Sequence, residues 1–141
     1  MEKEKRVIIA THGHLAEGFV SALHIIVGEM PHLRTVCCYT QPDFDLDKTI
    51  EDIMLHHDFD NEDLVVCTDM MGGSVNNGFT KYLGQYPFHL VTNINLAFLV
   101  DLLLTPGEID AAILELKTSD DLVDVKYINK LVECMDEEDD L

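Results

Sequence analysis

The stretch VIIATHGHLAEGFVSALHIIVG, residues 7–28, decides the fold. It opens with a short run that is apolar throughout, which predicts a buried strand over residues 6–10. Over residues 15–27, apolar side chains recur every three or four positions, the spacing of one face of a helix, and a glycine then ends the pattern. The stretch therefore predicts a strand, a polar loop that carries His12 and His14, and a helix.

Apolar strands and amphipathic helices continue to alternate along the chain. Further strands are predicted over 33–39, 64–68 and 88–92, further helices over 46–57, 75–83, 96–104 and 108–116, and an alternating, edge-type strand over 123–128. Apolar strands joined by helix-length connections are typical of a parallel sheet that is covered on both faces. The sequence therefore predicts a doubly wound α/β fold with three layers, α/β/α.

Charge and hydrophobicity narrow the functional class. The 141 residues include 27 acidic and 9 basic ones, which gives a formal net charge of −18. This excess disfavours binding to nucleic acid or to an anionic membrane surface, because both need Lys and Arg. The apolar fraction of 47% favours a folded chain over a disordered one. No apolar run approaches the roughly 20 residues of a membrane span, so we expect a soluble, cytosolic protein.

The acidic residues are concentrated in two segments. Residues 43–63 hold nine acids and one Lys, and residues 133–140 hold six acids and no base. We expect one domain over residues 1–132 and a frayed, solvated acidic tail over residues 133–141.

The cysteines form no CxxC motif, and three of them, Cys37, Cys38 and Cys67, lie in or at the end of apolar runs. We expect buried, reduced thiols that pack as small apolar groups, and we favour this over zinc binding.

Functional residues are expected beyond the carboxyl ends of the parallel strands, where open α/β sheets bind ligands. The first strand leads into His12, and the third leads into Asp69 and the turn Gly72-Gly73-Ser74. If these strands are neighbours, Asp69 can accept a hydrogen bond from one ring nitrogen of His12 and leave the other as a nucleophile. The turn can direct N–H groups and a hydroxyl at an anion. Together these features favour phosphoryl transfer through a phosphohistidine.

Other interpretations of these residues stay open. His12, His14 and Asp69 also form a pattern of metal ligands, which would suit a metal-dependent hydrolase. In the plainest interpretation, Asp69 caps a helix and the glycines only form a turn. The pair Met70-Met71 either forms an apolar rim for a docking protein or fills space.

Three motifs follow one another along the chain: VIIATHGHLAEG at 7–18, LVVCTDMMGGS at 64–74 and TNINLAFLVDLL at 92–103. Together they resemble the mannose-family EIIA domains of the bacterial phosphoenolpyruvate:sugar phosphotransferase system (PTS). The resemblance implies a doubly wound, mostly parallel sheet with an added antiparallel C-terminal strand, here within 122–128. In the family, this strand is exchanged across a homodimer.

The resemblance also implies roles for single residues. His12 matches the phosphorylated histidine, Asp69 the aspartate that orients it, and Ser74 the serine near the phosphoryl group. The donor would be HPr and the acceptor a cognate EIIB, ahead of the membrane components EIIC and EIID, with no metal and no dissociable cofactor. Two positions depart from the usual pattern, since Val75 and Leu96 stand where proline is common.

Two related functions share this fold and histidine. One is the phosphoryl-donor subunit for dihydroxyacetone kinase, and the other is a regulatory module that senses phosphorylation without feeding transport. The segment GHLAEG at 13–18 fits the sugar-transport branch better. Since no EIIB segment follows, we expect a free-standing EIIA.

Overall fold

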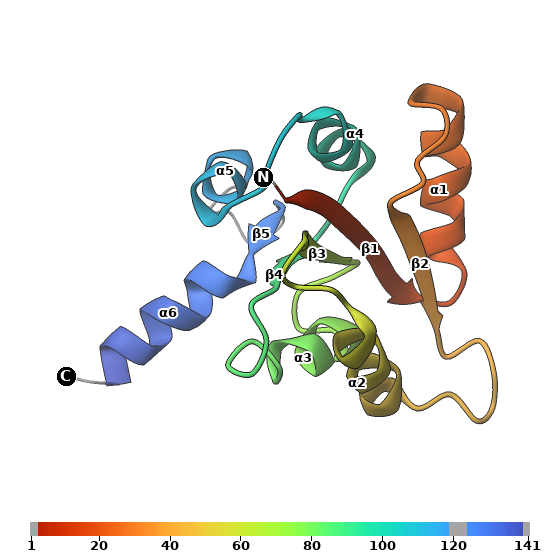
Figure 1. Ribbon diagram of the computed structural model, residues 1–141. Coiled ribbons are helices and arrows are strands. Elements are labelled where there is room, and N and C mark those ends of the chain that lie inside the picture. The colour runs from red at the N-terminus through yellow and green to blue at the C-terminus, as the bar shows by residue number, and fades with distance from the viewer. Residues whose placement is uncertain (1–2, 119–123, 140–141) are drawn as a thin grey trace.

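The computed structural model describes residues 3–118 and 124–139 and is built on one sheet (Figure 1). Its strands are β1 (Glu4–His12), β2 (Leu33–Cys38), β3 (Glu62–Thr68), β4 (His89–Thr92) and β5 (Lys126–Tyr127). They lie in the order β2-β1-β3-β4-β5. The first four are parallel, and β5 runs antiparallel to β4. The predicted doubly wound, mostly parallel α/β fold with an antiparallel C-terminal strand is confirmed.

Helices cover both faces of the sheet. They are α1 (Leu15–Ile26), α2 (Leu46–His56), α3 (Ser74–Thr80), α4 (Leu96–Leu104), α5 (Ala111–Lys117) and α6 (Ile128–Asp139). Helices α1, α4 and α5 supply the core on one face, while α2 and α3 supply it on the other. Helix α6 begins beside β4 and extends away from the sheet (Figure 1). In the described residues, no helix combines the length and the apolar character that crossing a membrane requires.

The central strand β1 is apolar on both faces because it serves two cores. Residues 7–10 are each at most 2% exposed. Val7 and Ile9 pack in the core that includes α1 and α4, whereas Ile8 and Ala10 pack in the core that includes α2 and α3. Successive side chains of a strand point to opposite faces. An unbroken apolar run is therefore the pattern that this position requires.

Several helix boundaries are set by side-chain caps. Asp45, Asn95 and Asp110 each accept a hydrogen bond from the backbone N–H three residues further on, at 3.1, 2.8 and 2.9 Å. Such caps satisfy N–H groups that have no partner within the helix. The cap at Asp110 explains why α5 begins at Ala111 and not at residue 108, as the apolar spacing had predicted.

The C-terminal segment differs from the prediction. The strand predicted over 123–128 is limited to Lys126–Tyr127 among the described residues, because the chain enters α6 at Ile128. The backbone of residues 133–139 is helical where we predicted a frayed tail. Ile128 is buried in the core of the α2 and α3 face. Once a packed turn has formed, adding further helical residues is cheap. The domain boundary at residue 132 stays a prediction.

Two buried thiols behave as the sequence predicts. Burial raises the pKa of Cys38 and of Cys67 to about 12, so both are protonated at neutral pH, and the nearby Asp69 carboxylate adds to the effect on Cys38. Cys37 is only half-buried.

Asn129 anchors α6 to the sheet. Its side-chain Oδ1 accepts a hydrogen bond from the N–H of Leu90 at 2.7 Å, and its Nδ2 donates to the carbonyl of Phe88 at 2.7 Å. We expect Asn129→Ala to lower the free energy of unfolding by about 1–3 kcal/mol, because both bonds are lost and a strand N–H loses its partner. Urea unfolding measures this change. The neighbouring Lys130 is exposed, so Lys130→Ala is the control. Equal stability of the two variants would show that Asn129 is not an anchor.

Candidate functional site

His12 and Asp69 meet at the carboxyl edge of the sheet. His12 is the last residue of β1, and Asp69 directly follows β3, which pairs with β1 in parallel. The Nδ1 atom of His12 lies 2.8 Å from Oδ2 of Asp69, and the same oxygen accepts the backbone N–H of His12 at 2.9 Å. The first and third strands are therefore neighbours, as the predicted pairing of His12 with Asp69 requires. Since an ionised carboxylate only accepts, Nδ1 carries the proton and Nε2 keeps its lone pair.

Ser74 faces the other ring nitrogen. Its Oγ lies 3.3 Å from Nε2 of His12 and 2.8 Å from the hydroxyl of Tyr39. The Tyr39 ring centroid lies 5.6 Å from that of His12. With the lone pair on Nε2, Ser74 donates to it and Tyr39 donates to Ser74. The three side chains therefore form a chain of hydrogen bonds that ends at the imidazole.

The turn before α3 needs its glycines. Gly72 has φ +78°, a backbone conformation that side chains rarely allow. A Cβ on Gly73 would lie 2.9 Å from Cγ of Met70 and 3.3 Å from Cε1 of His12. The absence of a side chain thus lets the turn approach the imidazole closely. The N–H of Gly73 already donates to the carbonyl of Met70 at 3.3 Å, so one of the three predicted N–H donors has an acceptor within the turn.

A residue at the end of β4 holds this turn through a hydrogen bond. Asn93 follows the strand with φ 57°, and its Oδ1 accepts the N–H of Met71 at 2.7 Å. Asn95, two residues further on, does not bond to the turn but caps α4. The carboxylate of Asp69 contributes as well, because its Oδ1 accepts the N–H of Met70 at 3.1 Å. Both oxygens of Asp69 are therefore engaged, one with the imidazole and one with the turn.

Tyr39 is a residue that sequence reasoning missed. The predicted site was built from residues at the ends of the first and third strands and left out the end of the second. Tyr39 directly follows β2, the other neighbour of β1. Applying the rule of the carboxyl edge to all four parallel strands would have identified it.

His14 takes no part in this cluster. Its Nδ1 pairs with Oε2 of Glu17 at 3.3 Å, and its side chain is 71% exposed. The metal-ligand set His12, His14 and Asp69 is not assembled in the described part of the chain, where a different group containing His14 comes together. The geometry therefore favours the pairing of His12 with Asp69 over the metal-dependent hydrolase.

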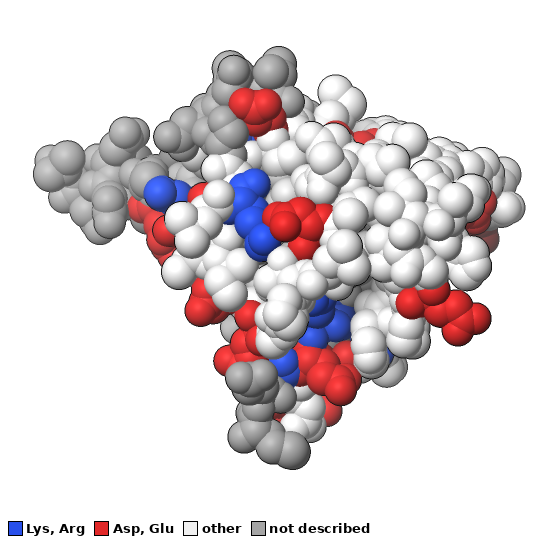
Figure 2. Space-filling model, turned by 90° about the horizontal axis from the view of Figure 1, so that it is seen from above, with Lys and Arg blue, Asp and Glu red and all other residues white. Residues whose placement is uncertain are grey.

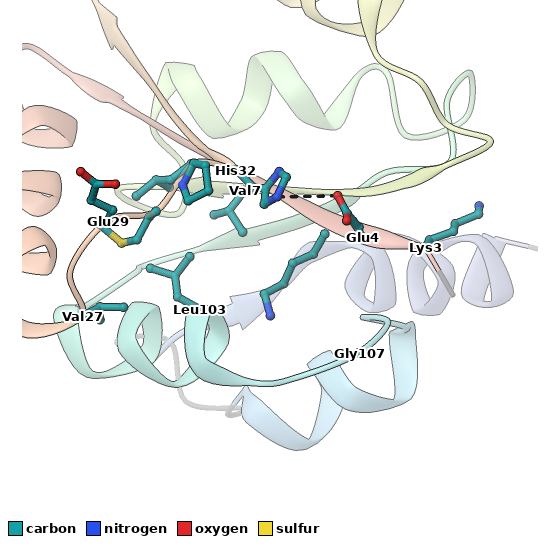
Figure 3. Close-up of a pocket in the computed structure, with 12 residues that line it drawn as sticks. Lys3, Glu4, Val7, Val27, Glu29, His32, Leu103 and Gly107 are labelled. Carbon is teal, nitrogen blue, oxygen red and sulfur yellow. Dashed lines mark ion pairs between the residues drawn. The ribbon is translucent and has the colours of Figure 1, made fainter. Parts of the chain in front are cut away.

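The site is an open surface with apolar surroundings. The His12 side chain is 43% exposed, and the large apolar residues Leu15, Tyr39 and Met70 are exposed near the ends of β1, β2 and β3. Met71 packs against the core, as the space-filling interpretation of the methionine pair expects. Met70 is exposed, and a docking role for it stays a prediction. A cavity of about 430 Å³ lies at the opposite, amino end of the sheet, where the side chains of Glu4 and His32 pair at 3.6 Å (Figure 3).

Two basic side chains form ion pairs with acidic residues and not with the groups around His12. Arg6 pairs with Glu62 at 3.2 Å at the amino end of the sheet, and Lys117 pairs with Asp101 at 2.6 Å. Figure 2 shows acidic and basic groups side by side on the face seen from above. The side chains that contact His12 in the described residues belong to Asp69, Ser74 and Tyr39. A negatively charged group on His12 would therefore meet neutral donors and not a Lys or Arg.

Comparisons with known proteins agree with this architecture. The model of the EIIA-man family, the PTS system fructose IIA component, matches residues 6–119. A solved structure of a phosphoenolpyruvate-dependent sugar PTS permease from Klebsiella pneumoniae is 33% identical, with a TM-score of 0.69 over 74% of this chain and 75% of that one. A comparison with curated proteins gave no significant match.

Two more distant structures show the same fold. One is a PTS IIA protein associated with the fucose utilization operon of Streptococcus pneumoniae, with 24% identity and a TM-score of 0.67 over 82% of this chain and 87% of that one. The other is a mannose/sorbose-specific IIA subunit from Enterococcus faecalis, with 22% identity and a TM-score of 0.71 over 81% and 86%. On the family match and the 33% identical relative, the chain belongs to the EIIA-man family of PTS components.

Proposed function

We propose that this chain is a phosphocarrier of sugar transport, which accepts a phosphoryl group from phospho-HPr on His12 and passes it to a cognate EIIB subunit. The contact of 2.8 Å between Nδ1 of His12 and Asp69 carries the proposal. It leaves Nε2 as the atom with a lone pair. The 33% identical relative is described as a sugar PTS permease, which supports sugar transport over the phosphorylation of dihydroxyacetone kinase or a purely regulatory role.

In the chemical step, only Nε2 of His12 reacts, and the proton on Nδ1 stays where it is. The lone pair on Nε2 attacks phosphorus, the bond between phosphorus and the donor breaks, and the proton on Nδ1 stays in its hydrogen bond to Asp69. The ring then carries a positive charge that the carboxylate stabilises. Transfer to EIIB reverses these events, since the acceptor attacks phosphorus and Nε2 recovers its lone pair.

The phosphoryl group needs donors at Nε2. We propose that Ser74 turns its hydroxyl from Nε2 to a phosphoryl oxygen while Tyr39 keeps it oriented. The backbone N–H groups of Gly72 and Ser74 would add to this site, together with that of Gly73 once it leaves the carbonyl of Met70. The distances of 3.3 and 2.8 Å along the hydrogen-bonded chain support the first part. Neutral donors suit a carrier, because hydrogen bonds of this kind are weaker than those of a Lys or Arg, and the group must be released again.

The two partners must reach His12 in turn. The exposed ring and its apolar surroundings support docking of HPr and then of EIIB at the same surface. The net charge of −18 would steer a basic partner toward the protein, which speeds encounter more than it tightens binding. We further propose a cytoplasmic homodimer with indirect coupling to EIIC and EIID. In the single chain, β5 pairs with β4 of the same chain through two residue pairs. Exchange of this strand between the two subunits would replace that pairing.

The first prediction concerns the phosphorylated residue. Incubation with phosphoenolpyruvate, enzyme I and HPr should add one acid-labile phosphoryl group per chain, measured by intact mass. His12→Ala should remove this label entirely, because it removes Nε2. His14→Ala is the matched control, since this exposed histidine lies two residues away and should leave labelling unchanged. A labelled His12→Ala protein, or an unlabelled wild type, would contradict the proposal.

The second prediction concerns the carboxylate. Asp69→Asn should slow phosphoryl transfer by roughly 10²-fold, because an amide cannot stabilise the charged ring as a carboxylate does. Rapid-quench measurement of transfer from phospho-HPr gives the rate. Asp52→Asn is the control, because Asp52 belongs to an exposed pair with His56 at 3.2 Å. An unchanged rate in Asp69→Asn, with the fold intact by circular dichroism, would eliminate the orienting role.

The third prediction concerns the hydroxyl chain. Tyr39→Phe should slow transfer by roughly threefold to tenfold, the effect of one neutral hydrogen bond. Ser74→Ala should have a larger effect because it removes the donor nearest to Nε2. The double variant should be no slower than Ser74→Ala, since Tyr39 acts through Ser74. Additive effects of the two changes would show that they act independently.

A further inference from the structure

A second cluster of ligating side chains lies beside the candidate site. His14 and Glu17 belong to the start of α1, and Cys37 lies on β2. One ring nitrogen of His14, a carboxylate oxygen of Glu17 and the Sγ atom of Cys37 all lie within 4.8 Å of one another. It is the only such group of three among the side chains that the structure describes, in residues 3–118 and 124–133. The ring of His12 bonds instead to Asp69 and Ser74.

The fold accounts for this juxtaposition. Cys37 is the register partner of Thr11 in the parallel pairing of β1 with β2, so it lies next to the strand end from which His14 emerges. His14 and Glu17 are three residues apart, and such residues share one face of a helix. His14 is the N-cap residue of α1, yet its ring does not cap the helix. That role in the first turn falls to Thr11, whose hydroxyl accepts the N–H of Ala16 at 2.8 Å.

The spacing suits a tetrahedral metal ion. The His14 Nδ1 and Glu17 Oε2 atoms are 3.3 Å apart, and bonds of about 2.0–2.1 Å to zinc place two such ligands about 3.3 Å apart. The sulfur of Cys37 lies within 4.8 Å of a ligand atom of each of the other two side chains. His14 and Glu17 are exposed, so their side chains can turn toward the thiol without disturbing the core.

We propose that His14, Glu17 and Cys37 bind one Zn²⁺ ion. Nitrogen and thiolate ligands select zinc and disfavour Ca²⁺ and Mg²⁺, which prefer oxygen. On binding, the Cys37 thiol loses its proton to water and the sulfur coordinates as a thiolate. Three protein ligands leave the fourth position of the ion to a water molecule. This site shares only His14 with the set of His12, His14 and Asp69 predicted from the sequence, and it does not depend on phosphoryl transfer.

The test measures metal binding directly. The full-length chain, reduced with a phosphine and stripped of metal, is titrated with Zn²⁺ against a competing chelator, and native mass spectrometry counts the ions. The expected result is one ion per chain. Zinc binding should weaken at least about tenfold in each of the variants Cys37→Ser, His14→Ala and Glu17→Gln. Even the loss of a residue that only hydrogen-bonds to a metal ligand costs about this much. Substitution with Co²⁺ should give a thiolate-to-metal charge-transfer band that Cys37→Ser abolishes.

The control is an exposed histidine–carboxylate pair without a thiol. His56 and Asp52 pair at 3.2 Å one helical turn apart, and His56→Ala should leave zinc affinity and the cobalt band unchanged. His14→Ala and Glu17→Gln alter exposed side chains, so they keep the test valid if Cys37→Ser fails to fold. Absence of zinc binding, or zinc binding that none of the three variants weakens, would overturn the proposal, and the latter result would place the ion elsewhere on the acidic surface.

Discussion

The hydrogen bond between Nδ1 of His12 and Asp69 is the interaction on which the candidate site depends. It exists because β1 and β3 are parallel neighbours that end at the same edge of the sheet. The same carboxylate holds the backbone N–H of His12 and the N–H of Met70. One side chain thus fixes the ring, the strand end and the turn that carries Ser74. A change in strand order would remove all of these contacts at once.

In the folded protein, the charged side chains at the amino end of the sheet differ from those around His12. Bases at the amino end of the sheet pair with acids, as Arg6 does with Glu62, whereas the groups around His12 are one carboxylate and neutral hydroxyls. Compensation for a phosphoryl group must therefore come from hydrogen-bond donors. This arrangement would suit the transient phosphorylated state proposed above, in which the chemistry of the site is separate from the net charge proposed to steer partners.

Much of the fold could be predicted from the sequence, because apolar runs at strand length and helical spacing depend on local pattern. The juxtaposition of His12 and Asp69 followed from one further rule, that function lies at the carboxyl edge of parallel strands. Tyr39 was missed because the end of the second strand was not considered. The pairing of His14 with Glu17 depends on side-chain direction in the first turn of α1, and the helical state of residues 133–139 depends on tertiary packing of the preceding turn. The hydrophobic pattern of the sequence does not predict either of these two features.

The most direct test of the central contact is to phosphorylate the protein and to determine which nitrogen of His12, the proposed acceptor, carries the phosphoryl group. Nuclear magnetic resonance of the phosphorylated protein, with nitrogen-15 in the histidine rings, distinguishes the two isomers by phosphorus coupling. If Asp69 holds the proton on Nδ1, phosphorylation must occur at Nε2, and Nδ1 must remain protonated. A phosphoryl group on Nδ1 would contradict the role assigned to Asp69, because the observed hydrogen bond and the new bond would then compete for the same atom.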